Sequence, residues 1–292
     1  MISILIPTYN YNALPLAETL EKQALKTGII FEIICMDDGS FSEHNKHNQR
    51  INSLTNSKFI ENIKNVGSKA NREQLAKKAQ YSWLLFIDAD SKPKSSNYLT
   101  NYLKEINQSY AAIFGGFAYQ DKSKNFNISL RYTFGKHREE VEANLRNKNP
   151  YKVIISANFL IKKATFIDIN DSITKNIYGL DYLFGSQLKR YNIKIKHIDN
   201  EVYHLGLDNN KTFLNKTRSA VEALHYISKS KKITIHNISL LRAYNNITNL
   251  GLKRPFTWLF LKFQIKIETH LIGKKPNLLV FDLYRLGYLC SL

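Results

Sequence analysis

Three short apolar runs within the first 90 residues each end in a cluster of polar side chains, and this alternation constrains the fold more than any other feature. The runs are residues 2–6, 30–36 and 83–87, and the clusters that follow are residues 8–10, 37–40 and 88–90. Helical patterns at 13–26 and 69–80 separate the runs, giving the β-α-β order typical of a mainly parallel sheet flanked by helices. Because ligands of such sheets bind beyond the carboxyl ends of the strands, we expect the three clusters to meet at one crevice.

Two of these clusters carry carboxylates. Asp88-Ala89-Asp90 follows a buried strand, so both acids can face one ligand from a turn, and Mg²⁺ or Mn²⁺ commonly bridges such carboxylates and substrate phosphates. Asp37-Asp38-Gly39-Ser40 has the composition of a tight turn. Because it is expected to lie beside Asp88-Ala89-Asp90, the cluster at 37–40 could also present a carboxylate that accepts an N–H of a nucleobase.

The chain changes character after about residue 210. Before it, strand-like runs at 111–119, 153–161 and 193–198 and a helical pattern at 177–191 continue the α/β alternation. After it, a helix is predicted from Thr212 onward, and residues 253–272 mix aromatic and basic residues without a clean helical spacing. We predict an α/β catalytic domain at 1–210 and a helical, basic and aromatic extension at 211–292.

The net charge of the chain is +18, and most of it lies in the second half. From residue 186 onward there are 18 Lys/Arg and 6 Asp/Glu, which accounts for +12. Such a surface can meet anionic lipid, nucleic acid or a phosphorylated acceptor, and it is equally compatible with a solvated lysine-rich face. No nucleic-acid motif is visible, so a nucleic-acid partner is not expected.

Four motifs lie in the first 90 residues, and two further segments lie between residues 178 and 207. The first four are Ile4-Leu5-Ile6-Pro7-Thr8-Tyr9-Asn10, Met36-Asp37-Asp38-Gly39-Ser40, Asn65-Val66-Gly67 with Arg72, and Leu85-Phe86-Ile87-Asp88-Ala89-Asp90. The later two are Tyr178-Gly179-Leu180-Asp181-Tyr182-Leu183-Phe184-Gly185 and Val202-Tyr203-His204-Leu205-Gly206-Leu207. Together the first four resemble family 2 glycosyltransferases, and the later two extend the resemblance to about residue 210. The resemblance implies a GT-A fold and an enzyme that inverts the anomeric centre.

The resemblance also implies roles for individual residues. Those implied to bind the nucleotide-sugar are Pro7, Thr8, Tyr9, Asp38, Asn65, Gly67, Arg72, Asp88 and Ala89. Asp90, Asp88 and His204 would hold a divalent cation, Mn²⁺ or Mg²⁺, although His204 is also compatible with a structural role. Asp181 would be the general base, and Leu180 departs from the family pattern, which commonly has a glutamate at this position.

We therefore expect a hexosyltransferase that moves a sugar from a nucleotide-diphosphate donor, by family frequency a UDP-sugar, to a hydroxyl of a glycan or glycolipid. The reaction would be metal-assisted and would serve cell-envelope polysaccharide biosynthesis. The alternatives are a non-catalytic basic module that binds membrane or nucleic acid, and a nucleotidyltransferase. The latter is disfavoured because no glycine-rich phosphate loop lies near the N-terminus.

A cytoplasmic location is expected, with peripheral contact at the inner face of the cell membrane as an open alternative. The N-terminus has no basic segment before its apolar residues, and no run of about 18 apolar residues occurs. The segment 253–272 could lie on a membrane, with aromatics in the interface and lysines on anionic headgroups. It could equally pack on the catalytic domain.

Overall fold

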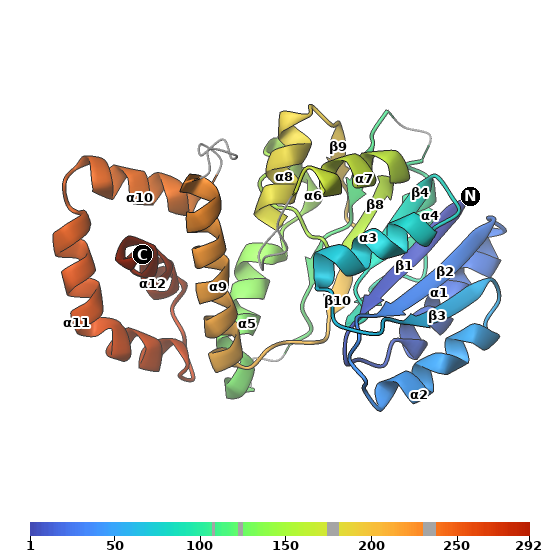
Figure 1. The fold of residues 1–292 in the computed structure, drawn as a ribbon, viewed down its shortest axis with the longest axis horizontal. Helices are drawn as coiled ribbons and strands as arrows, with labels where there is room; N and C mark the ends of the chain where they lie inside the picture. The colour runs from blue at the N-terminus through green and yellow to red at the C-terminus, as the bar shows by residue number, and fades with distance from the viewer. Residues whose placement is uncertain (107–108, 122–124, 174–180, 230–237) are drawn as a thin grey trace. The chain divides into compact units, whose positions relative to one another are not determined.

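The computed structural model describes residues 1–106, 109–121, 125–173, 181–229 and 238–292 (Figure 1). Its main sheet has seven strands in the order β3-β2-β1-β4-β8-β6-β9. These are β1 Ile2–Thr8, β2 Phe31–Asp37, β3 Ser57–Glu61, β4 Trp83–Ile87, β6 Ala112–Phe114, β8 Asn158–Lys162 and β9 Ile195–His197. A second, three-stranded sheet joins β5 Ser91–Pro93, β10 Val202–His204 and β7 Phe117–Ala118 in the order β5-β10-β7.

The main sheet is mostly parallel, as predicted. Strand β1 pairs in parallel with β2 and β4, β2 with β3, and β6 with β9, whereas β8 runs antiparallel to both β4 and β6. Residues Ile4, Leu5 and Ile6 of β1 are fully buried, as expected for a strand covered on both faces. Phe159 stacks between Phe86 and Phe114 with ring centroids 5.0 and 5.5 Å apart, so aromatic packing binds the antiparallel strand into the core.

Helices alternate with the strands in the first half of the chain and form most of its second half. They are α1 Leu14–Thr27, α2 His44–Asn48, α3 Ser68–Lys78, α4 Tyr98–Leu103, α5 Ser129–Phe134, α6 Ala143–Lys148, α7 Lys163–Asp171, α8 Asp181–Arg190, α9 Asn210–Lys229, α10 Ser239–Asn249, α11 Lys253–Leu271 and α12 Leu278–Ser291. Short 3-10 turns span Gln49–Ser53 and Phe126–Ile128, and a π-helical turn spans Gly135–Glu139. Gly28, in a left-handed conformation, ends α1.

The chain divides into two compact units, each built from several segments. One comprises residues 1–118, 141–176 and 187–206 and contains both sheets. The other comprises residues 119–140, 177–186 and 207–292 and is helical in its described part. Within the helical unit, α9, α10 and α11 frame α12, which packs against all three (Figure 1).

Two sequence predictions needed correction. The strand predicted at 111–119 is split into β6 and β7, because Gly116 between them has φ +88° and turns the backbone. The strand predicted at 153–161 begins only at Asn158. The segment 253–272 is helix α11 over most of its length, in agreement with the helical extension predicted at 211–292, although its own spacing is not cleanly helical. The predicted helix 177–191 is confirmed from Asp181; residues 177–180 lie outside the described residues.

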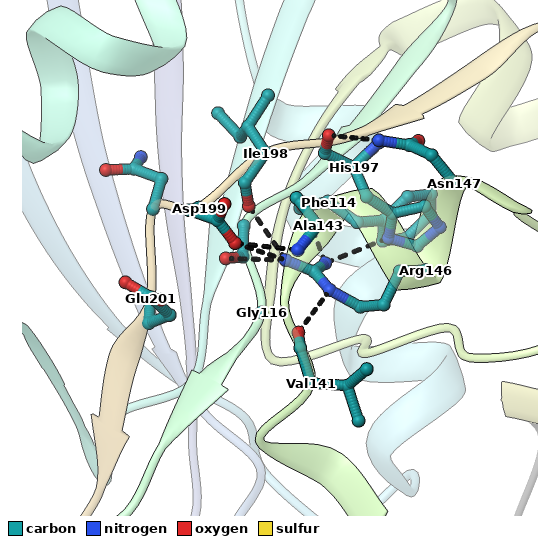
Figure 2. Close-up of polar contacts among 12 residues, drawn as sticks. Phe114, Gly116, Val141, Ala143, Arg146, Asn147, His197, Ile198, Asp199 and Glu201 are labelled. Atoms are coloured by element: carbon teal, nitrogen blue, oxygen red, sulfur yellow. Dashed lines mark hydrogen bonds and ion pairs between the residues drawn. The ribbon is translucent and has the colours of Figure 1, made fainter.

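Arg146 of α6 ties together backbone segments at the edge of the sheet (Figure 2). Its guanidinium donates to the carbonyl oxygens of Val141 (2.8 Å), Ile198 (2.8 Å) and Phe114 (3.2 Å), while its side chain is fully buried. It also lies 2.9 Å from Nδ1 of His197, whose Nε2 is 2.7 Å from the carbonyl oxygen of Pro150. Since a carbonyl only accepts, the neutral tautomer of His197 carries its proton on Nε2 and accepts from Arg146 on Nδ1.

Acidification is expected to destabilise the fold through His197. Burial, with a further contribution from the neighbouring Arg146 charge, lowers the pKa of this imidazole from 6.5 to about 4. Between these two values the unfolded chain binds a proton that the folded chain does not, so the free energy of unfolding falls as the pH is lowered from 6.5 to 4. The full loss, reached below the folded pKa, is roughly 3 kcal/mol.

Urea unfolding at neutral pH and near pH 4 measures this effect. A His197→Gln variant has no imidazole to protonate and is expected to be less stable at neutral pH but to show a shallower dependence on pH. Equal pH dependence in the two proteins would show that His197 does not supply the effect.

Candidate functional site

The loops after β1, β2 and β4 meet at one pocket, as the strand order predicted. Parallel register places Thr8 beside Asp37, and β4 lies on the other side of β1. The pocket is lined by Pro7, Thr8, Tyr9, Tyr11, Asp38, Ser68, Asn71, Arg72, Asp88, Ala89 and Asp90. Most of the residues that the resemblance implied for nucleotide-sugar binding therefore share one pocket; Asn65 and Gly67 are the exceptions.

Asp38 holds the segment that contains these two exceptions. Its Oδ1 accepts the backbone N–H of Val66 at 2.8 Å, and its Oδ2 accepts the N–H of Gly67 at 2.9 Å. Helix α3 begins one residue later, so Asp38 positions the start of the helix that carries Arg72. Asn65 supports the same turn by accepting from Gly67 at 3.0 Å. This structural role of Asp38 could not be predicted from the sequence, because its partners lie 28 and 29 residues away.

Gly39 lets the loop after β2 approach that segment closely. It has φ +64°, and a Cβ atom on it would lie 2.4 Å from the backbone carbon of Lys64. Both the conformation and the space therefore require glycine. Before it, Asp37 accepts the N–H of Ser40 at 2.8 Å and its hydroxyl at 2.7 Å, which closes the turn. The turn interpretation of the Asp-Asp-Gly-Ser cluster holds for Asp37.

Arg72 and Asp88 form an ion pair at the pocket wall. Nη2 of Arg72 is 2.5 Å from Oδ1 of Asp88, and both side chains are largely shielded from water. Nε of Arg72 is buried and finds no hydrogen-bond partner among the described residues. The ion pair with Arg72 fixes the orientation of the Asp88 carboxylate at this position.

Asp90 lies beside His204, which comes from the second sheet. Oδ2 of Asp90 is 3.2 Å from Nε2 of His204. Pairing of β10 with β5 sets His204 opposite Ser91, and the His204 ring stacks on Phe117 at 5.1 Å with a 10° interplanar angle. The N–H of Leu205 also donates to the backbone oxygen of Asp90 at 2.8 Å. Strand pairing and ring stacking thus bring together two predicted metal ligands that are 114 residues apart in sequence.

Gly206 leaves the room that the Asp90 carboxylate occupies. A Cβ atom on Gly206 would lie 2.2 Å from Oδ2 of Asp90. This glycine is a site residue that the sequence analysis did not single out. Tyr11 was missed as well: it lines the pocket, and partial burial together with the Asp90 charge raises the pKa of its hydroxyl.

The donor set here fits a cation only if a ligand supplies further oxygens. No group of three or more His, Cys, Asp or Glu side chains in the described residues converges as a metal site. Asp90 and His204 provide one carboxylate and one imidazole. Mg²⁺ sites in phosphate-transferring enzymes typically combine one or two carboxylates with substrate phosphates and water, and this pair suits such an arrangement.

Asp181, the predicted base, is the first residue of α8, and its side chain lies outside the described residues. The preceding Leu180 also lies outside them. The role of Asp181 therefore stays a prediction. No helix within the described residues combines the length and apolarity needed to cross a membrane.

Comparisons with known proteins bear on the fold and the family. A model of glycosyl transferase family 2 matches residues 3–169, and a search of curated proteins found no match. Among solved structures, a mannosyltransferase from Pyrobaculum calidifontis, in complex with GDP-Man and Mn²⁺, has a TM-score of 0.56 at 12% identity, covering 97% of this chain and 85% of that one.

Staphylococcus aureus TarS gives a TM-score of 0.52 at 17% identity, with 76% of this chain covered; the chain spans 39% of that TarS structure. A shorter form of TarS in complex with UDP-GlcNAc gives the same TM-score and identity, with 98% of this chain and 90% of that one covered.

The structure has the GT-A fold, with a mainly parallel sheet whose strand ends surround one acidic pocket. The matching family model covers more than half of the sequence. The chain belongs to glycosyl transferase family 2. The predictions of fold class, family and enzyme class are therefore confirmed.

Proposed function

We propose that this chain transfers a sugar, with inversion, from a nucleotide-diphosphate donor to a hydroxyl of a glycan or glycolipid. The observation that carries the proposal is the pocket in which Asp88 and Asp90 stand beside Asp38 and Tyr9 at the carboxyl ends of parallel strands. Two structurally similar proteins hold UDP-GlcNAc and GDP-Man, which supports a nucleotide-sugar donor. A UDP-sugar is our choice of donor.

The nucleoside would lie against Tyr9 and Asp38. Tyr9 is 59% exposed and lines the pocket, so its ring can serve as a surface for a base to stack on. An ionised carboxylate offers about four acceptor positions, and the backbone of Val66 and Gly67 uses two of those on Asp38. Asp38 can therefore hold the loop and still accept an N–H from a pyrimidine base.

The diphosphate would lie between Arg72 and the Asp90–His204 pair. Arg72 orients Asp88, and Asp90 and His204 would hold a Mn²⁺ or Mg²⁺ ion. When bound, that cation offsets the negative charge that grows on the departing nucleoside diphosphate. Asp88 would then contact the ribose or the sugar rather than the cation, because Arg72 already binds it.

Asp181 would take the proton from the acceptor hydroxyl as its oxygen attacks the anomeric carbon. Attack comes from the face opposite the nucleotide, so the new bond forms as the bond to the diphosphate breaks and the configuration inverts. The hydrophobic Leu180 beside this base would alter contacts with the acceptor relative to chains that have a glutamate there. We assign the reaction to residues 1–210 and regard 211–292 as an extension.

Nucleotide binding tests the proposal directly. Titration calorimetry with UDP and with GDP, each with and without Mn²⁺, is expected to show Mn²⁺-dependent binding, tighter for UDP. A panel of sugar donors assayed for slow hydrolysis would then identify the sugar. If neither nucleotide binds in the presence of Mn²⁺ or Mg²⁺, a non-catalytic binding module becomes the better account of this chain.

Replacing Gly206 with alanine is expected to weaken Mn²⁺-dependent UDP binding by about 10- to 100-fold, the range seen when groups that orient metal ligands are lost. The added methyl group would overlap Oδ2 of Asp90 and push that carboxylate out of place. Calorimetry measures the affinity.

Gly251→Ala is a matched control, because Gly251 lies in the helical unit and has open space around it. The φ of Gly251 is +72°, so this variant should be less stable, but its affinity for UDP should stay unchanged. Equal affinities for the two variants would contradict the role given to Gly206.

A further inference from the structure

Helix α11 exposes a row of large apolar side chains on one side. Trp258, Leu261 and Ile265 are 63%, 54% and 80% exposed. Their spacing of three and four residues places them along one line of the helix surface. Exposed apolar residues scattered singly need no explanation, but a continuous row on one helix indicates a surface that is covered by something else.

This outer row is separate from the face that holds α11 in the fold. The inner face carries Phe260, Ile267 and Leu271, which belong to the core cluster of the helical unit. A Cβ atom on Gly287 of α12 would lie 2.2 Å from the Phe260 ring, so the two helices approach closely and fix the orientation of α11. The core is complete without Trp258, Leu261 and Ile265.

Positive charge lies directly beside the apolar row. Lys262 and Lys266 are exposed, one turn apart, and Lys262 Nζ is 5.1 Å from the centroid of the Trp258 ring. The one acidic residue in the sequence of α11, Glu268, is engaged on the inner side by Arg218 at 2.6 Å. The outer face of α11 therefore combines apolar side chains with cations and carries no carboxylate to oppose them.

We propose that this face of α11 docks in the plane of an anionic lipid surface. Aromatic and aliphatic side chains would enter the boundary between headgroups and acyl chains, and the lysines would meet the lipid phosphates. Aliphatic groups such as Ile265 gain little on nucleic acid, whereas burial in the acyl boundary removes them from water. The 19 residues of α11 span about 28 Å along the surface. The proposal does not depend on sugar transfer.

Binding of the chain to anionic vesicles is expected to have two independent contributions, one apolar and one electrostatic. Each lysine near an anionic surface should raise binding about fivefold, so Lys262→Gln/Lys266→Gln is expected to weaken binding roughly 30-fold. At high salt the electrostatic contribution is screened, so the remaining binding should be mostly apolar. Trp258→Ser/Leu261→Ser/Ile265→Ser should remove most of this remaining binding.

Flotation of the full chain with phosphatidylcholine vesicles, with and without phosphatidylserine, tests the proposal. We expect flotation with the anionic vesicles and little with the neutral ones. Trp258 also supplies a spectroscopic probe, since the only other tryptophan, Trp83, is 7% exposed. Anionic vesicles should shift the emission of a Trp83→Phe variant to shorter wavelength, as expected when Trp258 leaves water.

Matched controls come from α1, which also exposes two lysines one turn apart, Lys22 and Lys26, and an apolar residue, Leu25. Lys22→Gln/Lys26→Gln and Leu25→Ser are expected to float like the parent chain. If the α1 and α11 lysine variants lost flotation to the same extent, the proposal would be overturned, since vesicle binding would then depend on net charge alone. Concentration-dependent self-association that the α11 apolar variant abolishes, without vesicle binding by the parent chain, would also overturn it and assign the face to a second copy.

Discussion

Asp90→Asn is expected to lower turnover by about 10³-fold while leaving the fold intact. Asparagine keeps the shape of the side chain but loses the charge that would hold a cation at the leaving diphosphate. Groups that stabilise developing charge in this way contribute several kcal/mol to the transition state. Release of UDP from the sugar donor measures turnover, and the midpoint of thermal unfolding reports on the fold.

A carboxylate outside the pocket provides the comparison for this variant. Asp208 pairs with Lys216 at 2.8 Å in the helical unit, and Asp208→Asn should change turnover by less than about twofold because surface ion pairs contribute little. The dependence of rate on Mn²⁺ concentration adds a second readout, since Asp90→Asn should need far more Mn²⁺. Normal turnover with an unchanged Mn²⁺ requirement would remove Asp90 from the metal site.

Asp181→Asn is expected to lower turnover by roughly 10²- to 10⁴-fold and to leave UDP binding with Mn²⁺ nearly unchanged. The amide cannot accept the proton of the acceptor hydroxyl, and that is the part of the reaction a general base contributes. Rate assays with an acceptor, together with calorimetry of UDP, separate these two effects. The acidic limb of the pH–rate profile, which reports ionisation of the base, should also disappear.

Loss of UDP binding together with turnover would argue that Asp181 supports the donor site instead of acting as a base. Asp171→Asn offers a control, since Asp171 is an exposed carboxylate at the end of α7. This variant should retain both UDP binding and turnover.

The elements that could be predicted from the sequence are those determined by residues close together along the chain. Strand β4 has the predicted bounds, and β1 and β2 differ by a residue or two at their ends, because each is a short, mostly apolar run followed by polar residues. The pocket followed from the order of these strands, since parallel strands present their carboxyl ends at one edge.

Features that depend on contacts between residues far apart in the chain could not be predicted from the sequence. Gly206 resembles any loop glycine until β10 brings it against Asp90, and Arg146 resembles a surface arginine until the carbonyls of Val141, Ile198 and Phe114 surround it. The helical spacing of α11 was hard to recognise in the sequence for a different reason. It carries apolar rows on two opposite faces, and the outer row blurs the single stripe that identifies an amphipathic helix.

The pairing of β10 with β5 and β7 also determines when the acidic pocket can be completed during synthesis. The ribosome makes β1 to β4 first, and their pairing in the parallel sheet requires nothing beyond residue 87. His204 and Gly206 emerge more than 100 residues later, so the Asp90 side of the pocket must wait for a contact of high sequence separation. A nascent chain released early, or a fragment ending at residue 169 where the family match stops, would contain Thr8, Tyr9 and Asp38 of the pocket but lack His204 and Gly206.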